Sequence, residues 1–583
     1  MPPSPSISPQ RDEPPIRDRG DACPGALRLH AANDGFLARI RIPAGLLTAH
    51  QGEVLADAAE RLGDGHLSLT SRGNLELRGL GDGCDRELAE LLDAAGLLPS
   101  PRHERVRNIL ASPPAGLDAY GAWGGTEDAE VRSADVQLWA RRLDALLCAS
   151  ETAVELSGRF LFALDDGRGD VTALGPDVSL VAEAGTAPGA VLLRVGADPA
   201  ALRIAEADVP RAALAAAEAF LAAARSAGTG AWRVRELPAE HALTARALAA
   251  HLTRTGIAAH YVEPSAPAGM PRHTPARTPA HGTSADPARE PASPVAFTSS
   301  ARPSSAHASS AHASSAQAPS AHASAAVPAP GLVEAPDGRR ALSVLVPLGR
   351  LSVAQWRLLC AVAARDGAGE LRLTPWRGVL VPGLSPETAG PRLRQLADAG
   401  LITDPRSPWR GTGACTGLPG CAKSLSDVRA DAEAAIAETA IAETAAADGE
   451  AAIATMAAPV ADASSSASGT SVSGTSASGT SASDMYAYGT LLPVHWSGCA
   501  RRCGHPHGAW VDVLATGDGG YQVSVRSGAG TGTGTGAKAG TGAKAGTETK
   551  AGPEASTAPG PLPLSDPAGL ARAIGAARHG TRT

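Results

Sequence analysis

The sequence has no apolar run that approaches the roughly 18 residues of a membrane-spanning helix, and its start lacks the basic and apolar stretches of an export signal. Its 52 basic residues are outnumbered by 59 acidic ones, which argues against bulk binding of nucleic acid. Its eight cysteines are too sparse over 583 residues for a disulfide scaffold. We therefore expect a cytoplasmic protein that binds neither membranes nor nucleic acid.

Lysine and large apolar side chains are also scarce. Lysine occurs only at positions 423, 538, 544 and 550, so any anion-binding site must be built mostly from arginine. Several blocks rich in Gly, Pro, Ala, Ser and Thr hold almost no large apolar residue and cannot bury enough surface to offset the entropy of ordering. We expect disorder in these blocks: 1–22, 264–330, 434–484 and 527–562.

The most informative feature is an internal repeat with an offset of 304 residues. Residues 38–48 read ARIRIPAGLLT, and residues 342–352 read LSVLVPLGRLS. Each copy predicts a strand, a helix capped by Thr48 or Ser352, a second strand, and a second helix that ends near Gly96 or Gly400. Two such β-α-β-α halves would pair into one sheet about a pseudo-two-fold axis. The expected strands are 37–42, 66–78, 342–346 and 370–381, and the expected helices are 48–62, 85–95, 352–365 and 388–399.

A longer α/β segment follows each half, so the fold class is α+β. In the first segment we expect a helix from Ser133 to about Ser150, strands near 153–163 and 190–195, and a helix over 209–226. The expected domains are a tail (1–22), half-domain 1 (23–100), α/β domain 1 (101–263), a linker (264–330), half-domain 2 (331–405), α/β domain 2 (406–526) and a low-complexity segment with a C-terminal helix (527–583).

Four of the eight cysteines fall in two glycine-flanked clusters of the second copy. An iron–sulfur cube needs four thiolates that converge through tight turns, whose amides hydrogen-bond the sulfurs. The pattern therefore predicts a [4Fe-4S] cluster, with a zinc site or inert buried thiols as the alternatives. The candidate ligands are Cys415 and Cys421, spaced Cys-x5-Cys, and Cys499 and Cys503, spaced Cys-x3-Cys. The cysteines without partners at ligand spacing are Cys23, Cys84, Cys148 and Cys360.

The motif LTSRGNLELRG at 69–79, the paired cysteines and the repeat resemble the sulfite/nitrite reductase family. In that family a ferredoxin-like half-domain and a cluster- or haem-binding α/β domain each occur twice. Within it, the sequence is most similar to the precorrin-3B synthases of aerobic cobalamin (vitamin B12) biosynthesis. This closer resemblance rests on CPG at 23–25, RNILASP at 107–113, RFLFALDDG at 159–167, and residues 414–428.

The resemblance implies an arginine-lined site for anionic groups. In the reductases this site is formed by two arginines and by two lysines that flank a phenylalanine; the matching positions here are Arg72, Arg107, Arg159 and Leu161. The apolar Leu161 favours the synthase over the reductase, because sulfite reduction needs charge and proton donors. Each arginine is alternatively an ordinary ion-pair or solvated residue. The residues expected to bind substrate are Arg72, Asn74, Arg107, Arg159 and Arg377, although the gapless register places Trp376 rather than Arg377 opposite Arg72.

The offset also explains why a single cluster is expected. It places Ala111 and Leu117 opposite the first cysteine pair. Aligning Ser157-Gly158 with Ser497-Gly498 places Arg159 and Ala163 opposite the second pair. The first copy therefore has no thiolates at these positions, and an arginine there would hold a carboxylate bidentately.

By resemblance, the protein is an oxidoreductase of the monooxygenase class. Dioxygen hydroxylates precorrin-3A at C20, a ring-A acetate closes a γ-lactone, and NADH is the ultimate reductant. The implied partners are the tetrapyrrole substrate, dioxygen and an external electron donor or reductase. The cluster would relay electrons. The family also implies a mononuclear non-haem iron, for which His505 and His507 are candidate ligands unless they are exposed turn residues. The alternatives are a sirohaem-dependent sulfite or nitrite reductase and a non-enzymatic cluster-bearing module.

Overall fold

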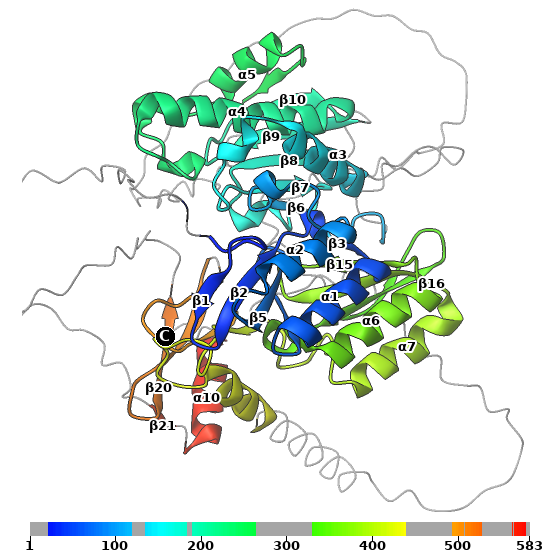
Figure 1. Cartoon of the computed structure of the whole chain (residues 1–583), viewed down its shortest axis with the longest axis vertical. Helices are drawn as coiled ribbons and strands as arrows, with labels where there is room; N and C mark the ends of the chain where they lie inside the picture. The colour runs from blue at the N-terminus through cyan, green and yellow to red at the C-terminus, as the bar shows by residue number, and fades with distance from the viewer. Residues whose placement is uncertain are drawn as a thin grey trace, which may run out of the picture. The chain divides into compact units, whose positions relative to one another are not determined.

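The computed structural model describes residue 21 and the ranges 23–118, 134–183, 189–263, 329–438, 492–506, 508–526, 562–563 and 565–578 (Figure 1). All of these ranges belong to one compact unit. His507 and almost all of the blocks expected to be disordered lie outside the described residues. No helix in the described ranges is long and apolar enough to cross a membrane.

Each repeat copy folds as a half-domain of antiparallel strands with two helices (Figure 1). The first copy contains β1 (His30–Ala32), β2 (Gly35–Ile40), β3 (Leu46–Thr48), α1 (Ala49–Leu62), β4 (His66–Leu69), β5 (Leu75–Leu80) and α2 (Asp85–Ala94). The second copy contains β12 (Gly331–Glu334), β13 (Arg340–Leu345), β14 (Arg350–Ser352), α6 (Val353–Asp366), β15 (Glu370–Leu373), β16 (Gly378–Leu384) and α7 (Pro386–Asp398). The alternating apolar residues of both copies form one shared core.

The strands expected over 66–78 and 370–381 are each a hairpin, so this prediction was wrong. In the first copy Thr70 N donates to Asn74 O at 2.9 Å, and Gly73 adopts a φ of +62°. A positive φ suits glycine and reverses the chain between β4 and β5. The apolar alternation runs through both strands and hides the turn. Arg72 therefore lies in a turn instead of a strand.

The two copies exchange one strand each. Strand β3 pairs with β15, and β14 pairs with β4. The result is two five-stranded sheets, ordered β1-β2-β5-β4-β14 and β12-β13-β16-β15-β3, and not the single sheet expected. Helices α1 and α6 lie side by side (Figure 1), and Trp356 Nε1 donates to Gly52 O at 2.7 Å. These two residues are 304 positions apart, which confirms the pseudo-two-fold relation of the copies.

The predicted helix starts and stops are confirmed. The Thr48 hydroxyl accepts from Gln51 N while the Gln51 side chain accepts from Thr48 N, and Ser352 forms the same capping box with Gln355. Gly96 and Gly400 follow the ends of α2 and α7 with φ values of +69° and +85°. Glycine is favoured there because the left-handed region closes the last helical turn.

The first α/β domain forms a six-stranded sheet in the order β11-β10-β9-β8-β7-β6, in which β6, β7 and β8 are parallel. The expected helix begins at Val136, capped by the side chain of Asp135, and the expected strand over 153–163 is confined to β7. Its elements are β6 (Ile109–Ala111), α3 (Val136–Ala149), β7 (Phe162–Asp165), β8 (Val178–Ala182), β9 (Ala190–Val195), β10 (Ala201–Ala205), α4 (Val209–Ala227), α5 (Ala245–Arg254) and β11 (His260–Val262).

The second α/β domain repeats this strand pattern. Its sheet order is β17-β18-β19-β20-β21, and β17, β18 and β19 are parallel. A helix over 428–438 enters the block expected to be disordered from 434. The elements are β17 (Thr412–Ala414), β18 (Val494–Ser497), β19 (Trp510–Ala515), β20 (Gly520–Arg526), β21 (Leu562–Pro563) and α10 (Pro567–Arg578).

Candidate cluster site and arginine network

The four candidate cysteines lie on two loops that leave neighbouring parallel strands. Cys415 follows β17 directly, and Cys499 lies two residues beyond the end of β18. Because parallel strands end at the same edge of a sheet, both loops lie at that edge. Gly498 N donates to Cys415 Sγ at 3.3 Å, which joins the two loops. Five residues then separate Cys415 from Cys421 on the first loop, and three residues separate Cys499 from Cys503 on the second.

The four thiols are close enough to affect one another. Burial raises the pKa of the Cys503 thiol, Arg501 opposes this shift, and the other three cysteines raise the pKa further. Within the described ranges, no three of these sulfurs lie within 4.8 Å of one another. A tetrahedral zinc ion with Zn–S bonds of about 2.3 Å would bring them to about 3.8 Å. The cysteines are therefore not arranged as a compact tetrahedral zinc site.

Two glycines of these loops have no room for a side chain. A Cβ on Gly498 would overlap the Ser424 hydroxyl, and a Cβ on Gly417 would lie 3.0 Å from a methyl of Val428. Gly417 also adopts a φ of +73°. The backbone therefore packs closely around the sulfurs and leaves its amides available to them.

Arg377 lies beside this cysteine edge. Its backbone occupies the turn position of Gly73 with a φ of +60°, and Arg377 N donates to Thr374 O as Gly73 N does to Thr70 O. Trp376 therefore corresponds to Arg72, as the gapless register predicts. A Cβ on Gly413 would lie 2.6 Å from Arg377 Nη1, so the guanidinium lies against the backbone of β17. Among the described residues it has no hydrogen-bond or ion-pair partner, and burial lowers its pKa.

Further guanidinium groups surround the cysteine loops. Arg429 Nε donates to Cys415 O at 3.3 Å, and Arg78 Nη2 donates to Gly420 O at 2.9 Å. Burial and the nearby Arg350, Arg78 and Arg377 lower the pKa of Arg429 to about 10. Sequence reasoning missed Arg78 and Arg429. Arg78 falls inside the motif at 69–79, but no sequence signal distinguishes it there from Arg72.

Arg72 and Arg159 come together near Cys23. Arg72 Nη1 donates to Gly158 O at 3.4 Å, and burial together with Arg233 lowers the pKa of Arg72 to about 10. The exposed Arg159 guanidinium stacks over Trp232 at 4.9 Å from the ring centroid. Cys23 forms a side-chain hydrogen bond with Arg159. The structure thus brings together two of the five residues expected to bind substrate.

Arg41 is a further cation that the sequence did not single out. Its Nη2 donates to Gly158 O and its Nε to Arg105 O, each at 3.2 Å. Burial, Arg39 and Arg72 lower its pKa to about 9. Burial is the main cause of these lowered arginine pKa values, and neighbouring arginines add to it, so several cations lie near one another in a poorly solvated region.

Glu76 and Arg39 connect these two groups of arginines. Glu76 forms an ion pair with Arg39, which lies close enough to affect Arg41 and Arg72. Glu76 also acts on Arg377 and Arg429. Both groups therefore belong to one electrostatic network, which we call the arginine network: Arg39, Arg41, Arg72, Arg78, Arg377 and Arg429. A ligand with several negative charges would compensate it.

Arg107 and Asn74 do not join the arginine network. Arg107 is 4% exposed, donates to both Asp144 oxygens at 2.7 Å and donates to Leu97 O at 2.9 Å. Asn74 is 1% exposed and accepts from Ile42 N at 2.9 Å. The polar groups of both residues are already used within the protein, and their role in substrate binding stays a prediction.

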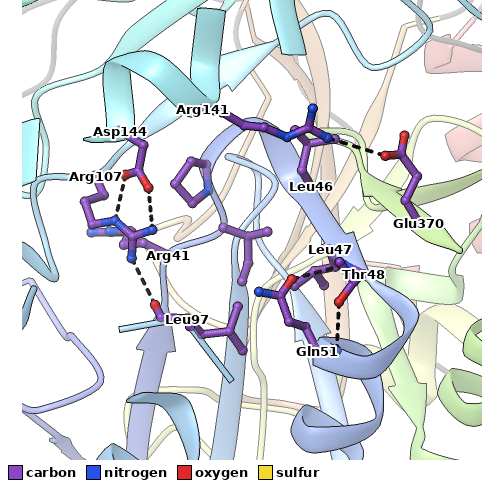
Figure 2. Close-up of a pocket in the computed structure, with 13 residues that line it drawn as sticks. Arg41, Leu46, Leu47, Thr48, Gln51, Leu97, Arg107, Arg141, Asp144 and Glu370 are labelled. Atoms are coloured by element: carbon purple, nitrogen blue, oxygen red, sulfur yellow. Dashed lines mark hydrogen bonds and ion pairs between the residues drawn. The ribbon is translucent and has the colours of Figure 1, made fainter. Parts of the chain in front are cut away.

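A pocket of about 270 Å³ lies beside Arg107 (Figure 2). Its charged lining is largely self-paired: Arg107 with Asp144, and Arg141 with Glu370 at 3.5 Å. Figure 2 shows the Thr48–Gln51 capping box on another side of it. Arg41 of the arginine network also lines this pocket, so the pocket adjoins the network, although its other charged residues are paired with one another.

His505 is an exposed turn residue. Its ring stacks on Trp510 with centroids 5.1 Å apart, and its Nδ1 lies 2.8 Å from Pro506 O. A buried histidine lies closer to the cysteines: His495 Nε2 is 3.0 Å from Cys503 O, and burial and Arg377 lower its pKa to about 3. Its Nδ1 has no partner within the described residues.

The residues of the first copy that correspond to the four cysteines are not the expected ones. Ser112 N donates to Leu164 O at 3.0 Å, and in the second copy Cys415 N donates to Trp496 O at the same distance. Asp166 N likewise donates to Ser112 Oγ at 3.2 Å, as Gly498 N does to Cys415 Sγ. Ser112 and Asp118 therefore correspond to Cys415 and Cys421, and Gly167 and Val171 to Cys499 and Cys503.

This result corrects both earlier assignments. Ala111 and Leu117 were placed opposite the first cysteine pair one residue too early. The offset between the two copies shortens by one residue between the second half-domain and β17. The Ser-Gly match was coincidental, since Ser157 precedes β7 whereas Ser497 ends β18. Arg159 and Ala163 therefore do not correspond to Cys499 and Cys503.

Two stretches, 29–95 and 333–399, match the nitrite/sulfite reductase ferredoxin-like half domain. Both repeat copies are therefore similar to the ferredoxin-like half-domains of nitrite and sulfite reductases. The NirA protein of Mycobacterium tuberculosis has the same fold, with a TM-score of 0.50 at 16% identity over 84% of this chain and 74% of that chain. The duplicated reductase fold is thus confirmed.

Two kinds of relative match this reductase-like chain. A ferredoxin–nitrite reductase of Synechococcus elongatus is 45% identical over 86 residues, which is 14% of this chain and only 17% of that relative. A precorrin-3B synthase of Sinorhizobium is 25% identical over 419 residues, which is 72% of this chain and 73% of that relative. The similarity to the reductases is therefore local, whereas the similarity to the synthase is extended.

Proposed function

We propose that this chain is an oxygen-dependent tetrapyrrole hydroxylase of the precorrin-3B synthase type. The observation that carries the proposal is the extent of similarity, which reaches 73% of the length of a precorrin-3B synthase. The nitrite reductases share only 17% of their length with the chain. The proposed substrate is precorrin-3A, hydroxylated at C20 with closure of a γ-lactone by the ring-A acetate.

The arginine network suits such a substrate. A tetrapyrrole carries many carboxylates around its rim, and guanidinium groups bind carboxylates through paired, charge-assisted hydrogen bonds. Arg72, Arg377 and Arg429 would take these groups, because each is only half-buried and its poorly solvated surroundings lower its pKa. Fixing the rim at several points would hold C20 in one place for reaction with dioxygen.

An apolar wall lies next to these cations. Leu161 is 2% exposed in a small cluster with Leu110, Ala163 and Val171, against which Trp376 packs. The reductases place a lysine at the position of Leu161, by the family resemblance. Replacing that charge with a buried hydrocarbon removes a donor that small-anion reduction would use.

The cysteine loops fit a [4Fe-4S] group, which Cys415, Cys421, Cys499 and Cys503 would hold. When bound, the cluster would supply single-electron transfer to the oxygen chemistry. We propose that NADH provides the two electrons through an external reductase and that the reaction takes place in the cytoplasm. A mononuclear non-haem iron stays a prediction of the family resemblance.

The test uses the full chain purified without oxygen. Iron, sulfide and tetrapyrrole are measured first, and the protein is then supplied with precorrin-3A, a reductant and ¹⁸O₂. We expect a product that gains one oxygen atom from dioxygen while the other leaves as water. An intact cluster without oxygen uptake or product would refute the hydroxylase and support a non-enzymatic cluster protein.

A sirohaem-dependent sulfite or nitrite reductase is the second candidate. It is favoured by the local identity of 45% to a nitrite reductase. An intense Soret absorption band in the purified protein, together with oxidation of a reduced donor on addition of nitrite or sulfite, would establish it. A weak, broad absorption without a Soret band would exclude permanent sirohaem.

A further inference from the structure

The loop that corresponds to the second cysteine loop carries buried carboxylates in the first copy. Asp165, Asp166 and Asp170 are 0%, 1% and 1% exposed, respectively. One oxygen from each lies within 4.8 Å of the others. Asp166 N is hydrogen-bonded to Ser112 Oγ, in the same arrangement that joins the two cysteine loops. The first copy thus keeps the loop geometry and carries buried carboxylates at positions close to, but not the same as, those of the second cysteine pair.

The carboxylates outnumber the cations around them. Arg168 forms ion pairs with Asp118 at 3.0 Å and with Asp166 at 2.6 Å, and it is itself 5% exposed. Among the described residues, Asp165 and Asp170 have no basic partner of their own. Asp165 accepts instead from backbone amides, those of Gly167, Gly169 and Thr172. Several kcal/mol are lost for each carboxylate that is buried as an unpaired ion. The site therefore requires either protons or another cation.

One oxygen of the group has no partner. Asp170 Oδ1 accepts from Ser112 Oγ at 2.6 Å and from Val171 N at 2.8 Å. Asp170 Oδ2 is fully buried and has no hydrogen-bond partner within the described ranges. The same is true of Gln137 Oε1, whose amide nitrogen donates to Ser112 O at 3.1 Å. Buried oxygens are normally satisfied, so unpaired acceptors at an acidic site point to a missing positive ligand.

We propose that Asp165, Asp166 and Asp170 bind a hard divalent cation at the pseudo-symmetric counterpart of the cysteine site. Oxygen donors select hard ions such as Ca²⁺, whereas thiolates select soft metals and clusters. Ca²⁺ bonds to oxygen at about 2.3–2.6 Å, so oxygens on opposite sides of it are at most about 5 Å apart. The 4.8 Å limit of the three carboxylates fits this size.

The ion would stabilise the first α/β domain without taking part in redox chemistry. It would connect the end of β7 to the turn at Asp170 and, through Ser112, to the loop after β6. These are the counterparts of the two loops that the cluster would join in the second copy. Both copies would then bind a metal on the same pair of loops, through donors at different loop positions.

The test uses the full chain purified without oxygen, so that iron and sulfide can be followed separately. The protein is exchanged into buffer with EGTA and titrated with CaCl₂, and then in parallel with MgCl₂. We expect one Ca²⁺ per chain, a dissociation constant below about 10⁻³ M, and a rise in the unfolding temperature as Ca²⁺ saturates the site. The iron and sulfide contents should not change.

Two variants assign the ion to this site. Asp170→Asn should remove the bound Ca²⁺ and the temperature shift. Glu155→Gln is the control, since it changes an exposed ion pair with Arg225 in the same domain. This variant should keep the bound Ca²⁺ and the temperature shift. If Asp170→Asn does not fold, the wild-type titration decides the question alone.

Two results would overturn the proposal. One is a wild-type protein that binds neither ion and whose unfolding temperature does not respond to them, because protons would then balance the carboxylates. The other is iron in excess of the cluster that disappears in Asp170→Asn, because the site would then hold a redox metal. Both results come from metal analysis and unfolding without precorrin-3A, whereas the hydroxylase is tested by oxygen incorporation into that substrate, so the two failures are distinguishable.

Discussion

The two α/β domains share one strand pattern and use its loops in opposite ways. After β17 and β18 the second domain places thiols on glycine-rich turns, with Cys503 exposed at the surface. After β6 and β7 the first domain places carboxylates, a serine and Arg168, nearly all of them buried. Matching hydrogen bonds show that these are the same loops. The difference shows that the geometry is set by the sheet and the chemistry by a few loop side chains.

The largest expected effect comes from making the second copy resemble the first. Cys415→Ser introduces the residue that Ser112 supplies in the first copy, and a hydroxyl is a poor ligand for iron. We expect loss of nearly all cluster iron and acid-labile sulfide, and of the activity that depends on them. Iron and sulfide analysis of anaerobically purified protein measures this directly.

Cys84→Ser is the matched control for this change. Cys84 precedes α2 and lies away from both cysteine loops. It should leave the iron and sulfide contents at the wild-type level. If Cys415→Ser retained a full cluster, the assignment of the ligands would be wrong.

The next effect tests the charge balance of the first copy. Arg168→Met would leave Asp118 and Asp166 without their ion-pair partner in a buried site. Removing one member of a buried pair destabilises a protein by about 3–5 kcal/mol. Denaturant unfolding should show this loss, whereas Arg501→Met, at an exposed position of the corresponding loop, should change stability by less than about 0.5 kcal/mol. Equal stabilities would mean that Arg168 contributes little.

The duplicated fold and the grouping of four cysteines on two loops could be predicted from the sequence, because both leave local signals. The two copies keep one constant offset, which matches Thr48 with Ser352. The four candidate cysteines form two closely spaced pairs flanked by glycine. The exchange of β3 and β14 between sheets left no such signal, because pairing over hundreds of residues depends on how the two halves pack. The hairpin turn was missed because apolar alternation continues on both sides of it.

The arginines were harder to predict for a similar reason. An arginine in a sequence says nothing about which carboxylates lie opposite it, and Arg107 proved to be paired with Asp144. Arg41 and Arg429 came into the network only through the packing of distant segments. The loops after β6 were misaligned because a single residue lost from the offset changes every later correspondence.

The third effect compares the arginines of the two copies. Arg377→Ala removes a buried guanidinium without a protein partner, and a hydrogen bond to a charged group contributes about 1.5–3 kcal/mol. We therefore expect kcat/KM for the tetrapyrrole to fall about 10- to 100-fold. Arg159→Ala should have a smaller effect, because its exposed guanidinium is screened by water. Steady-state rates with Arg406→Ala as the control, whose side chain is 91% exposed, test this order.

The smallest effect concerns the turn that the two copies share. Gly73 and Arg377 occupy equivalent positions with φ values of +62° and +60°, a region that costs a non-glycine residue about 1 kcal/mol. Arg377→Gly and Arg377→Ala both remove the guanidinium, so their difference in stability isolates the backbone. We expect the glycine variant to be more stable by about 1 kcal/mol, and Gly73→Ala to be less stable than the wild type by a similar amount. Denaturant midpoints measure both, and a glycine variant no more stable than the alanine variant would show that Arg377 holds its conformation without strain. If the strain is present, the second copy keeps an unfavourable backbone in order to present this side chain to the cysteine edge.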